Sequence, residues 1–234
     1  MLQLASQPAL IDRVHDRLLA AIADGTLPPG RRLTQESVAS LLGVSRQPVS
    51  HALQVLKRRG LLIEHGKRGL QVAPIDGRRI RELYQVREAL DGMAARLAAQ
   101  RLRAGEASEA ELEQARAVLD DGLRLEPIAL TSRLIETDVA FHSAIHRLSG
   151  NRAIVETIAD QWPHFMRSMG LVLSVTGAYA RYWQEHATIF EAILDGNAAD
   201  AEELSRRHTA AAGEETAARL NAESTKVSTH GGSP

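Results

Sequence analysis

The first 60 residues alternate between short segments with a helical apolar pattern and groups of turn residues. From Pro8 to Ala23, apolar side chains recur every three or four positions, which predicts an amphipathic helix that ends before Pro28–Gly30. The same spacing predicts a second helix over Thr34–Leu42 and a third over Ser45–Arg59. Because only a short glycine-containing turn separates these two helices, the pattern predicts a helix-turn-helix.

A pattern typical of a β-hairpin follows the third helix. Leu61–Glu64 and Leu70–Val72 are expected to form two short strands, and His65–Gly69 between them contains two glycines and two basic residues. A basic hairpin beside a helix-turn-helix is a wing, which can reach the minor groove or the phosphates while the last helix lies in the major groove. Residues 8–74 are therefore predicted to form a winged helix-turn-helix domain.

The remainder of the chain shows helical periodicity interrupted by Gly, Pro and capping residues. Six helices are predicted, over residues 77–103, 108–124, 127–148, 151–175, 178–195 and 198–221. Pro163 is expected to kink the fourth of these helices. Residues 78–222 should thus form an all-α bundle, and the polar residues 223–234 are expected to be a disordered tail. The predicted fold class is mainly α.

Composition limits the classes of protein that the sequence can encode. The 234 residues are 44% apolar and 3% aromatic, which suits packed helices, and they include no cysteine, which excludes disulfides and thiolate metal sites. No apolar segment approaches the roughly 20 residues of a membrane span, and the N-terminus has no secretory signal pattern. We therefore expect a soluble, cytoplasmic protein that does not bind membranes.

The formal net charge of −1 conceals an uneven distribution of charge. Residues 1–74 contain ten Lys or Arg against five Asp or Glu, a surplus of five positive charges, so the remainder has a surplus of six negative charges. A basic N-terminal third attached to an acidic body indicates a nucleic-acid-binding module joined to a second domain.

The residues expected to contact DNA lie at the start of the third helix and on the wing. Arg46 can form two hydrogen bonds with guanine, and Gln47 can bind adenine. An exposed arginine on a helix can equally be a solvated surface residue. The candidate DNA-binding residues are Arg31, Arg32, Ser45, Arg46, Gln47, Ser50, His65, Gly66, Lys67 and Arg68.

Polar residues interrupt the buried stripes of four predicted body helices. The interrupting residues are Arg87 on the first helix, Asp138 and His142 on the third, His186 on the fifth and His208 on the sixth. Isolated core histidines are common, but buried ionisable groups are costly unless they meet a partner. Asp138 and His142 are four residues apart and share a helix face, so the set is a candidate metal site. His146 is an alternative ligand, because it also lies on that face.

The donor atoms of this set limit the metals that it can bind. Imidazole and carboxylate suit a divalent ion; zinc is favoured, and nickel, manganese and iron are compatible. With an open coordination position, such a site could hold the carboxylate of a small acid, with Arg87 as a second binding group.

The N-terminal motif "PPGRRLTQESVASLLGVSRQPVSHALQVLKRRGLLIEHGKRGLQV" resembles the winged-helix domain of GntR-type transcription regulators over nearly all of residues 8–74. The family usually has an arginine where this chain has Ser50. The family's usual operator sequence should therefore not be assumed for this chain.

The body contains "LYQVREALDGMAARLAA", "ETDVAFHSAIHRLSGN" and "EHATIFEAILDGNAADAEELSRRH", which look like the FadR-type effector-binding (FCD) domain of GntR regulators. The resemblance implies a divalent metal beside a cavity for small organic acids. It places the metal ligands at Asp138, His142, His186 and His208 and the effector-binding arginine at Arg87. Asp91 stands where the family usually has glutamate.

The function expected from these observations is a homodimeric, ligand-responsive transcription regulator. It would be a repressor of a catabolic operon, would bind a pseudo-palindromic double-stranded DNA operator, and would be released or modulated by a small carboxylate. The alternatives are a metal-sensing regulator and a metalloenzyme with a DNA-binding appendage. The sequence contains no GxSxG, HExxH, P-loop or GxGxxG motif, so we do not expect an enzyme.

Overall fold

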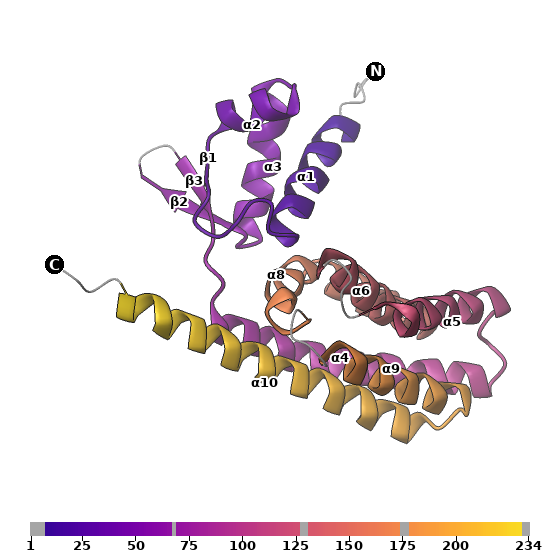
Figure 1. Ribbon diagram of the computed structural model, residues 1–234. Coiled ribbons are helices and arrows are strands. Elements are labelled where there is room, and N and C mark those ends of the chain that lie inside the picture. Colours follow the sequence, from indigo (N-terminus) through magenta and orange to yellow (C-terminus); the bar gives the residue numbers. More distant parts are fainter. Residues whose placement is uncertain (1–7, 67–68, 127–130, 174–177, 231–234) are drawn as a thin grey trace, which may run out of the picture. The chain divides into compact units, whose positions relative to one another are not determined.

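A computed structural model describes residues 8–66, 69–126, 131–173 and 178–230 of the protein. The chain divides between Ile75 and Asp76 into two compact units. The architecture confirms the predicted fold class, since a small winged-helix unit precedes a unit built of helices (Figure 1).

The first unit contains the three helices that the apolar pattern predicts. They are α1 (Pro8–Ala23), α2 (Gln35–Leu42) and α3 (Arg46–Arg58). Thr34 caps α2 by accepting a hydrogen bond from the backbone N–H of Ser37, as a helix N-cap does. Val49, Leu53 and Leu56 of α3 are fully or almost fully buried against the other elements of this unit, which positions the start of α3 at the surface.

The wing is a three-stranded antiparallel sheet rather than the predicted two-stranded hairpin. Its strands are β1 (Arg32–Leu33), β2 (Leu62–His65) and β3 (Gly69–Val72), in the order β1-β3-β2. The additional strand β1 pairs Arg32 with Gln71 and Leu33 with Leu70. Two residues are too few to show an alternating pattern, so sequence periodicity could not identify this strand.

The second unit has seven helices within the residues that the structure describes. They are α4 (Gly77–Arg103), α5 (Glu109–Arg124), α6 (Thr131–Leu148), α7 (Arg152–Ala159), α8 (Trp162–Leu173), α9 (Ala178–Leu194) and α10 (Ala198–His230). The long helices α4 and α10 run antiparallel along each other (Figure 1). Glycines permit their close approach, since a Cβ atom at Gly213 would lie only 2.7 Å from the Cβ atom of Tyr84.

One predicted helix of the body was wrong. The predicted helix over residues 151–175 is two helices, and Pro163 does not kink a helix but lies in the first turn of α8, where its missing N–H costs little. The polar segment that begins at residue 223 is helical as far as His230, and residues 231–234 of the expected disordered tail lie outside the described residues. No helix among the described residues has the length and apolar character needed to cross a membrane.

Candidate functional site

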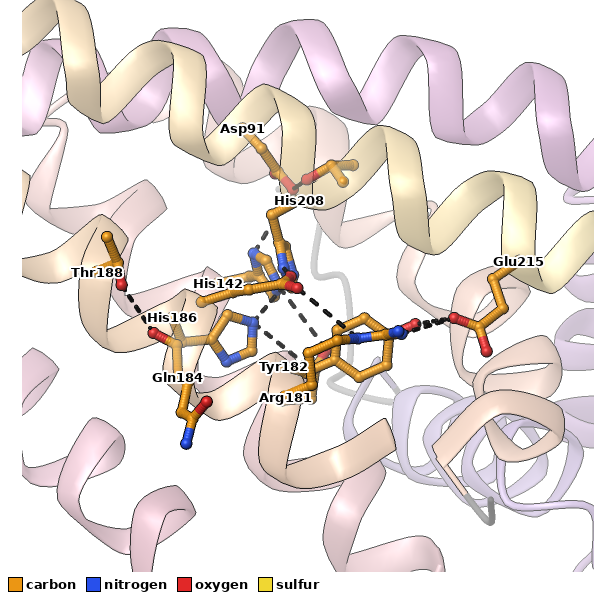
Figure 2. A network of polar contacts seen from close by, with 12 residues as sticks. Asp91, His142, Arg181, Tyr182, Gln184, His186, Thr188, His208 and Glu215 are labelled. Carbon is orange, nitrogen blue, oxygen red and sulfur yellow. Dashed lines mark hydrogen bonds and ion pairs between the residues drawn. The ribbon is translucent and has the colours of Figure 1, made fainter. Parts of the chain in front are cut away.

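Three histidines from three different helices meet in the interior of the second unit. His142 comes from α6, His186 from α9 and His208 from α10, and each offers a ring nitrogen within 4.8 Å of those of the other two. The Nε2 atoms of His186 and His208 are 3.0 Å apart. Figure 2 shows the three rings facing one another. The structure therefore brings together the three histidines that the sequence selected as candidate ligands.

Asp138 joins this cluster from the helical turn before His142. Its Oδ2 atom lies 3.8 Å from the Nε2 atom of His142, and its Oδ1 atom lies 3.7 Å from the Nε2 atom of His186. Two donor atoms bonded to the same zinc ion lie roughly 3–3.5 Å apart, because each bond is about 2 Å long. The two distances from Asp138 and the 3.0 Å between His186 and His208 are thus close to those that a shared divalent ion requires, whereas the nitrogens of the three histidines as a set lie within 4.8 Å of one another.

The protonation chemistry of the cluster also suits a metal ion. Burial lowers the pKa of His142 and of His186 well below the usual value for histidine, so both rings favour the neutral form that binds metals. Burial raises the pKa of Asp138, because a carboxylate there has lost its water. Among the described residues, the Nε2 atom of His142 is buried and has no hydrogen-bond partner. A divalent cation would satisfy both the nitrogen and the carboxylate.

Asp91 on α4 connects the cluster to Arg87. Its carboxylate accepts hydrogen bonds from Arg87 Nε at 3.0 Å, His146 Nε2 at 2.7 Å and Thr209 Oγ1 at 2.8 Å. It also lies 3.5 Å from the Nδ1 atom of His142. Burial by itself would raise the pKa of Asp91, but the charge of Arg87 and the hydrogen bonds from His146 and Thr209 lower that pKa to about 2.

The outer nitrogens of the histidines have different environments. The Nδ1 atom of His142 faces Asp91, and that of His208 donates to Glu185 Oε2 at 2.7 Å. These contacts favour the tautomer that leaves Nε2 available to a metal. The Nδ1 atom of His186 is buried without a hydrogen-bond partner among the described residues.

Arg87 is buried beside the cluster and points its guanidinium group towards aromatic rings. The Cζ atom lies 4.7 Å from the ring centre of Trp162 and 5.1 Å from that of Phe165. Burial would lower the pKa of Arg87, but the charge of Asp91 outweighs burial and the pKa is raised, so the group is a permanent cation. Asp138, His142, His208 and Arg87 line one cavity. The volume of this cavity is about 30 Å³.

The sequence did not reveal the partners of these residues. His146, which the sequence offered as an alternative ligand, binds Asp91 instead and lies outside the three-histidine group. The spacing of Arg87 and Asp91 by four residues was a visible signal for their ion pair. No spacing in the sequence indicates the contacts of Asp91 with α6 and α10 or the contact of Glu185 with His208. These contacts join helices that are distant in sequence.

The candidate DNA-binding residues of α3 are accessible at its N-terminal end. Ser45, Arg46 and Gln47 are exposed. The Nη2 atom of Arg46 donates to Glu36 Oε1 of α2 at 3.0 Å, and both side chains remain largely exposed. Ser45 occupies the N-cap position, but its side chain makes no capping hydrogen bond, so its hydroxyl is not used within the helix. The Oγ atom of the half-buried Ser50 accepts a hydrogen bond from Gln35 Nε2 at 3.1 Å.

Four other candidate DNA-binding residues lie in or beside the sheet. Arg31 and Arg32 are exposed at β1, and His65 ends β2 beside the exposed Gly66. Gly66 has a φ of +64°, a conformation that glycine adopts readily and that permits the turn at the wing tip. Lys67 and Arg68 lie outside the described residues.

A winged helix followed by a helical unit with an internal Asp/His cluster defines a class of two-domain transcription regulators. Residues 82–211 match the FCD domain family, and residues 10–72 match the family described as "Bacterial regulatory proteins, gntR family". The chain belongs to the GntR family of transcription regulators and carries an FCD domain. The relatives that the chain matches are transcription regulators, and the chain is likewise a regulator and not an enzyme.

Similar proteins extend over most of the chain. The HTH-type transcriptional regulator YdhC of Bacillus subtilis (strain 168) is 25% identical over 203 residues, 84% of each chain. A regulator in an unstable DNA locus of Streptomyces ambofaciens is 30% identical over 187 residues, 78% of this chain and 74% of the relative. The solved structure of E. coli McbR/YncC has the same fold, with a TM-score of 0.71 at 20% identity over 95% of this chain and 99% of the other.

Proposed function

We propose that this protein is a homodimeric repressor of a catabolic operon, released from or modulated on its operator by a small organic acid bound beside a divalent metal. The observation that carries the proposal is the convergence of Asp138, His142, His186 and His208 in one cluster, beside a cavity that Asp138, His142, His208 and Arg87 line. When bound, the ion would supply a Lewis-acidic position for a carboxylate, with zinc favoured by the donor set and nickel, manganese or iron compatible.

The cavity lies where a bound acid can change how the helices of the second unit pack. Its lining comes from α4, α6, α8, α9 and α10, so an occupant contacts helices that are far apart in sequence. Arg87 is held by Asp91, which in turn contacts α6 and α10, and a carboxylate that attracts Arg87 acts on this whole network. The acid changes DNA binding only if it binds the two conformations of the protein with different affinities.

The name of one relative supports a role at a catabolic operon, and the name of a second supports a role at an operon. A relative from Paenarthrobacter nicotinovorans, 33% identical over 94 residues, bears the name "Probable D-xylose utilization operon transcriptional repressor". Another, from Aminobacter aminovorans, is named "Nta operon transcriptional regulator" and is 28% identical over 130 residues.

The surface of α4 supports a homodimer. Val86 and Met93 are seven residues apart and therefore lie on one face of the helix, and they are 54% and 39% exposed. Exposed apolar side chains on one helix face are suited to a second copy of the same face. A two-fold dimer presents two winged helices and thus predicts a pseudo-palindromic operator.

Replacing Arg46 with alanine is expected to weaken specific DNA binding. Loss of a bidentate contact to guanine costs about 1–3 kcal/mol, which corresponds to roughly 5- to 150-fold in the dissociation constant. The measurement is a binding titration on an operator selected from random duplex DNA. Arg152→Ala, which removes an arginine that is 92% exposed on the second unit, is the control. Equal affinity of the Arg46→Ala and wild-type proteins would remove Arg46 from the recognition surface.

The effector part of the proposal is tested by thermal unfolding of the metal-loaded protein with a panel of carboxylic acids. An acid at a hundred times its dissociation constant adds about 2.7 kcal/mol to the free energy of unfolding. We expect Arg87→Gln and chelation each to abolish that stabilisation. A metal-loaded protein that responds to no acid, but whose DNA binding changes with metal alone, is a metal sensor and contradicts the proposal.

A further inference from the structure

The N-terminal end of α2 contacts α3 at two places that are one helical turn apart. Glu36 Oε1 accepts a hydrogen bond from Arg46 Nη2 at 3.0 Å, and Gln35 Nε2 donates one to Ser50 Oγ at 3.1 Å. Arg46 and Ser50 are four residues apart, so they lie on the same face of α3. Both are candidate DNA-binding residues, and the start of α2 therefore borders the surface that is expected to face DNA.

The backbones on both sides of the contact between Glu36 and Arg46 are held in place. The start of α2 is fixed by a capping box, in which Ser37 Oγ also accepts a hydrogen bond from the backbone N–H of Thr34. Val38 of α2 belongs to the buried apolar cluster of the first unit, and α2 packs against α3 (Figure 1). The pair thus joins two helices whose relative position is set by the core.

The pair itself adds little to the stability of the fold. The side chains of Glu36 and Arg46 are 77% and 66% exposed, and exposed ion pairs contribute little because water screens them. When DNA covers the pair, the loss of water lowers the local dielectric and strengthens the contact. Substitutions of Glu36 are therefore expected to leave the fold intact and to act on DNA binding.

A carboxylate at this position is unfavourable for affinity. Among the ion pairs that the structure describes in the first unit, that of Glu36 includes a candidate DNA-binding residue, whereas Glu64 pairs with Lys57 and Asp16 with His15. DNA phosphates repel a carboxylate, so Glu36 weakens binding to every sequence alike. Such a cost is compatible with function where the same group improves discrimination between sequences.

Glu36 restricts the positions that the Arg46 side chain can adopt. An arginine that rotates freely can bind a phosphate, which adds affinity for any sequence, or guanine, which adds affinity for one base. The contact with Glu36 uses one N–H of the guanidinium and leaves the others for guanine O6 and N7. An arginine held in this way finds two acceptors on guanine, whereas adenine presents a donor in place of one of them.

We propose that Glu36 is a specificity-determining residue of the DNA-binding surface, which holds Arg46 where it reads guanine and keeps it from the phosphates. Glu36 acts through Arg46 and makes no base contact of its own. It lowers the affinity for DNA in general and raises the preference for guanine at one position. The inference rests on the proposed function, because it assumes that Arg46 contacts the operator.

The test compares the sequences that each full-length variant selects from one library of random duplex DNA. The guanine that Arg46 reads is the position at which Arg46→Ala loses its preference. We expect Glu36→Ala to reduce the preference for that guanine by about fivefold or more. Because its freed Arg46 can bind a phosphate, Glu36→Ala should also bind unselected DNA more tightly, with a log–log dependence on salt that is steeper by about 0.9.

Three further variants separate the hydrogen bond from the charge. Glu36→Gln keeps an accepting oxygen at the same side-chain length, so it should lose less of the guanine preference than Glu36→Ala. Asp12→Ala removes a negative charge from an exposed position of α1 in the same unit and should keep the wild-type preference. The double variant Glu36→Ala/Arg46→Ala should select the same bases as Arg46→Ala. Thermal unfolding of each variant checks that it is folded.

The outcomes distinguish this inference from the function on which it rests. If Arg46→Ala changes no base preference, the recognition role of Arg46 fails and the inference fails with it. If Arg46→Ala loses a guanine that Glu36→Ala keeps, the inference is wrong while the role of Arg46 stands. Different base preferences for Arg46→Ala and the double variant would show that Glu36 reads a base itself, which also contradicts the inference. Equal losses in Glu36→Gln and Glu36→Ala would overturn the role of the hydrogen bond.

Discussion

Replacing Asp91 with alanine is expected to lower the free energy of unfolding of the second unit by about 3–5 kcal/mol, the cost of removing one partner of a buried ion pair. The substitution leaves the buried guanidinium of Arg87 without its 3.0 Å partner. It also removes the acceptor of His146 and of Thr209. The measurement is the shift in the urea midpoint at an unchanged m-value.

The chain contains a matched control for this substitution. Asp120 and Arg124 form an ion pair with the same four-residue spacing, but their side chains are 47% and 77% exposed. Exposed pairs of this kind contribute about 0–1 kcal/mol, so Asp120→Ala should change the unfolding midpoint little. Similar losses for the two variants would show that the Asp91 network does not stabilise the unit.

Chelation of the metal-loaded protein is expected to produce the second large effect. A ligand present at a thousand times its dissociation constant stabilises the folded state by about 4 kcal/mol. For a unit of this size, that loss corresponds to a fall of about 8–16 °C in the unfolding temperature. Differential scanning calorimetry before and after chelation, with metal content measured in parallel, checks the prediction.

Variants determine whether this stabilisation comes from the cluster. His142→Ala removes a ligand from the centre of the group and should eliminate the difference between the loaded and chelated states. His51→Ala changes an exposed histidine of α3 in the other unit and should retain it. A metal-dependent shift that survives in His142→Ala would place the ion at another site.

The sequence predicted the members of the cluster but not their partners. Each of Asp138, His142, His186 and His208 interrupts an apolar stripe, and a buried polar group must find a partner, so their convergence followed from helical periodicity and the cost of burial. His142 and His146 share one helix face, and periodicity cannot distinguish their roles. Their roles are set by α4, whose Asp91 binds His146, and by α9 and α10, whose histidines meet His142.

The same distinction between local and tertiary information applies to the fold. Helices with clear caps, such as α2 after Thr34, were predicted within one residue of their observed bounds. The break between α7 and α8 was not predicted, because Pro163 was interpreted as a kink inside one helix, whereas it lies in the first turn of a new helix. The two-residue strand β1 forms only because β3 is available to pair with it.

The two tryptophans lie close enough to the cluster for their fluorescence to report on it. The chain has two, and both touch the cluster or its supporting residues. The ring of Trp183 is 4.8 Å from that of His186, and the ring of Trp162 is stacked 6.2 Å from that of His146 and lies against Arg87. No tryptophan of the winged-helix unit dilutes this signal. Intrinsic fluorescence is therefore expected to respond to the metal content of the cluster, with a paramagnetic ion such as nickel quenching the emission more than zinc.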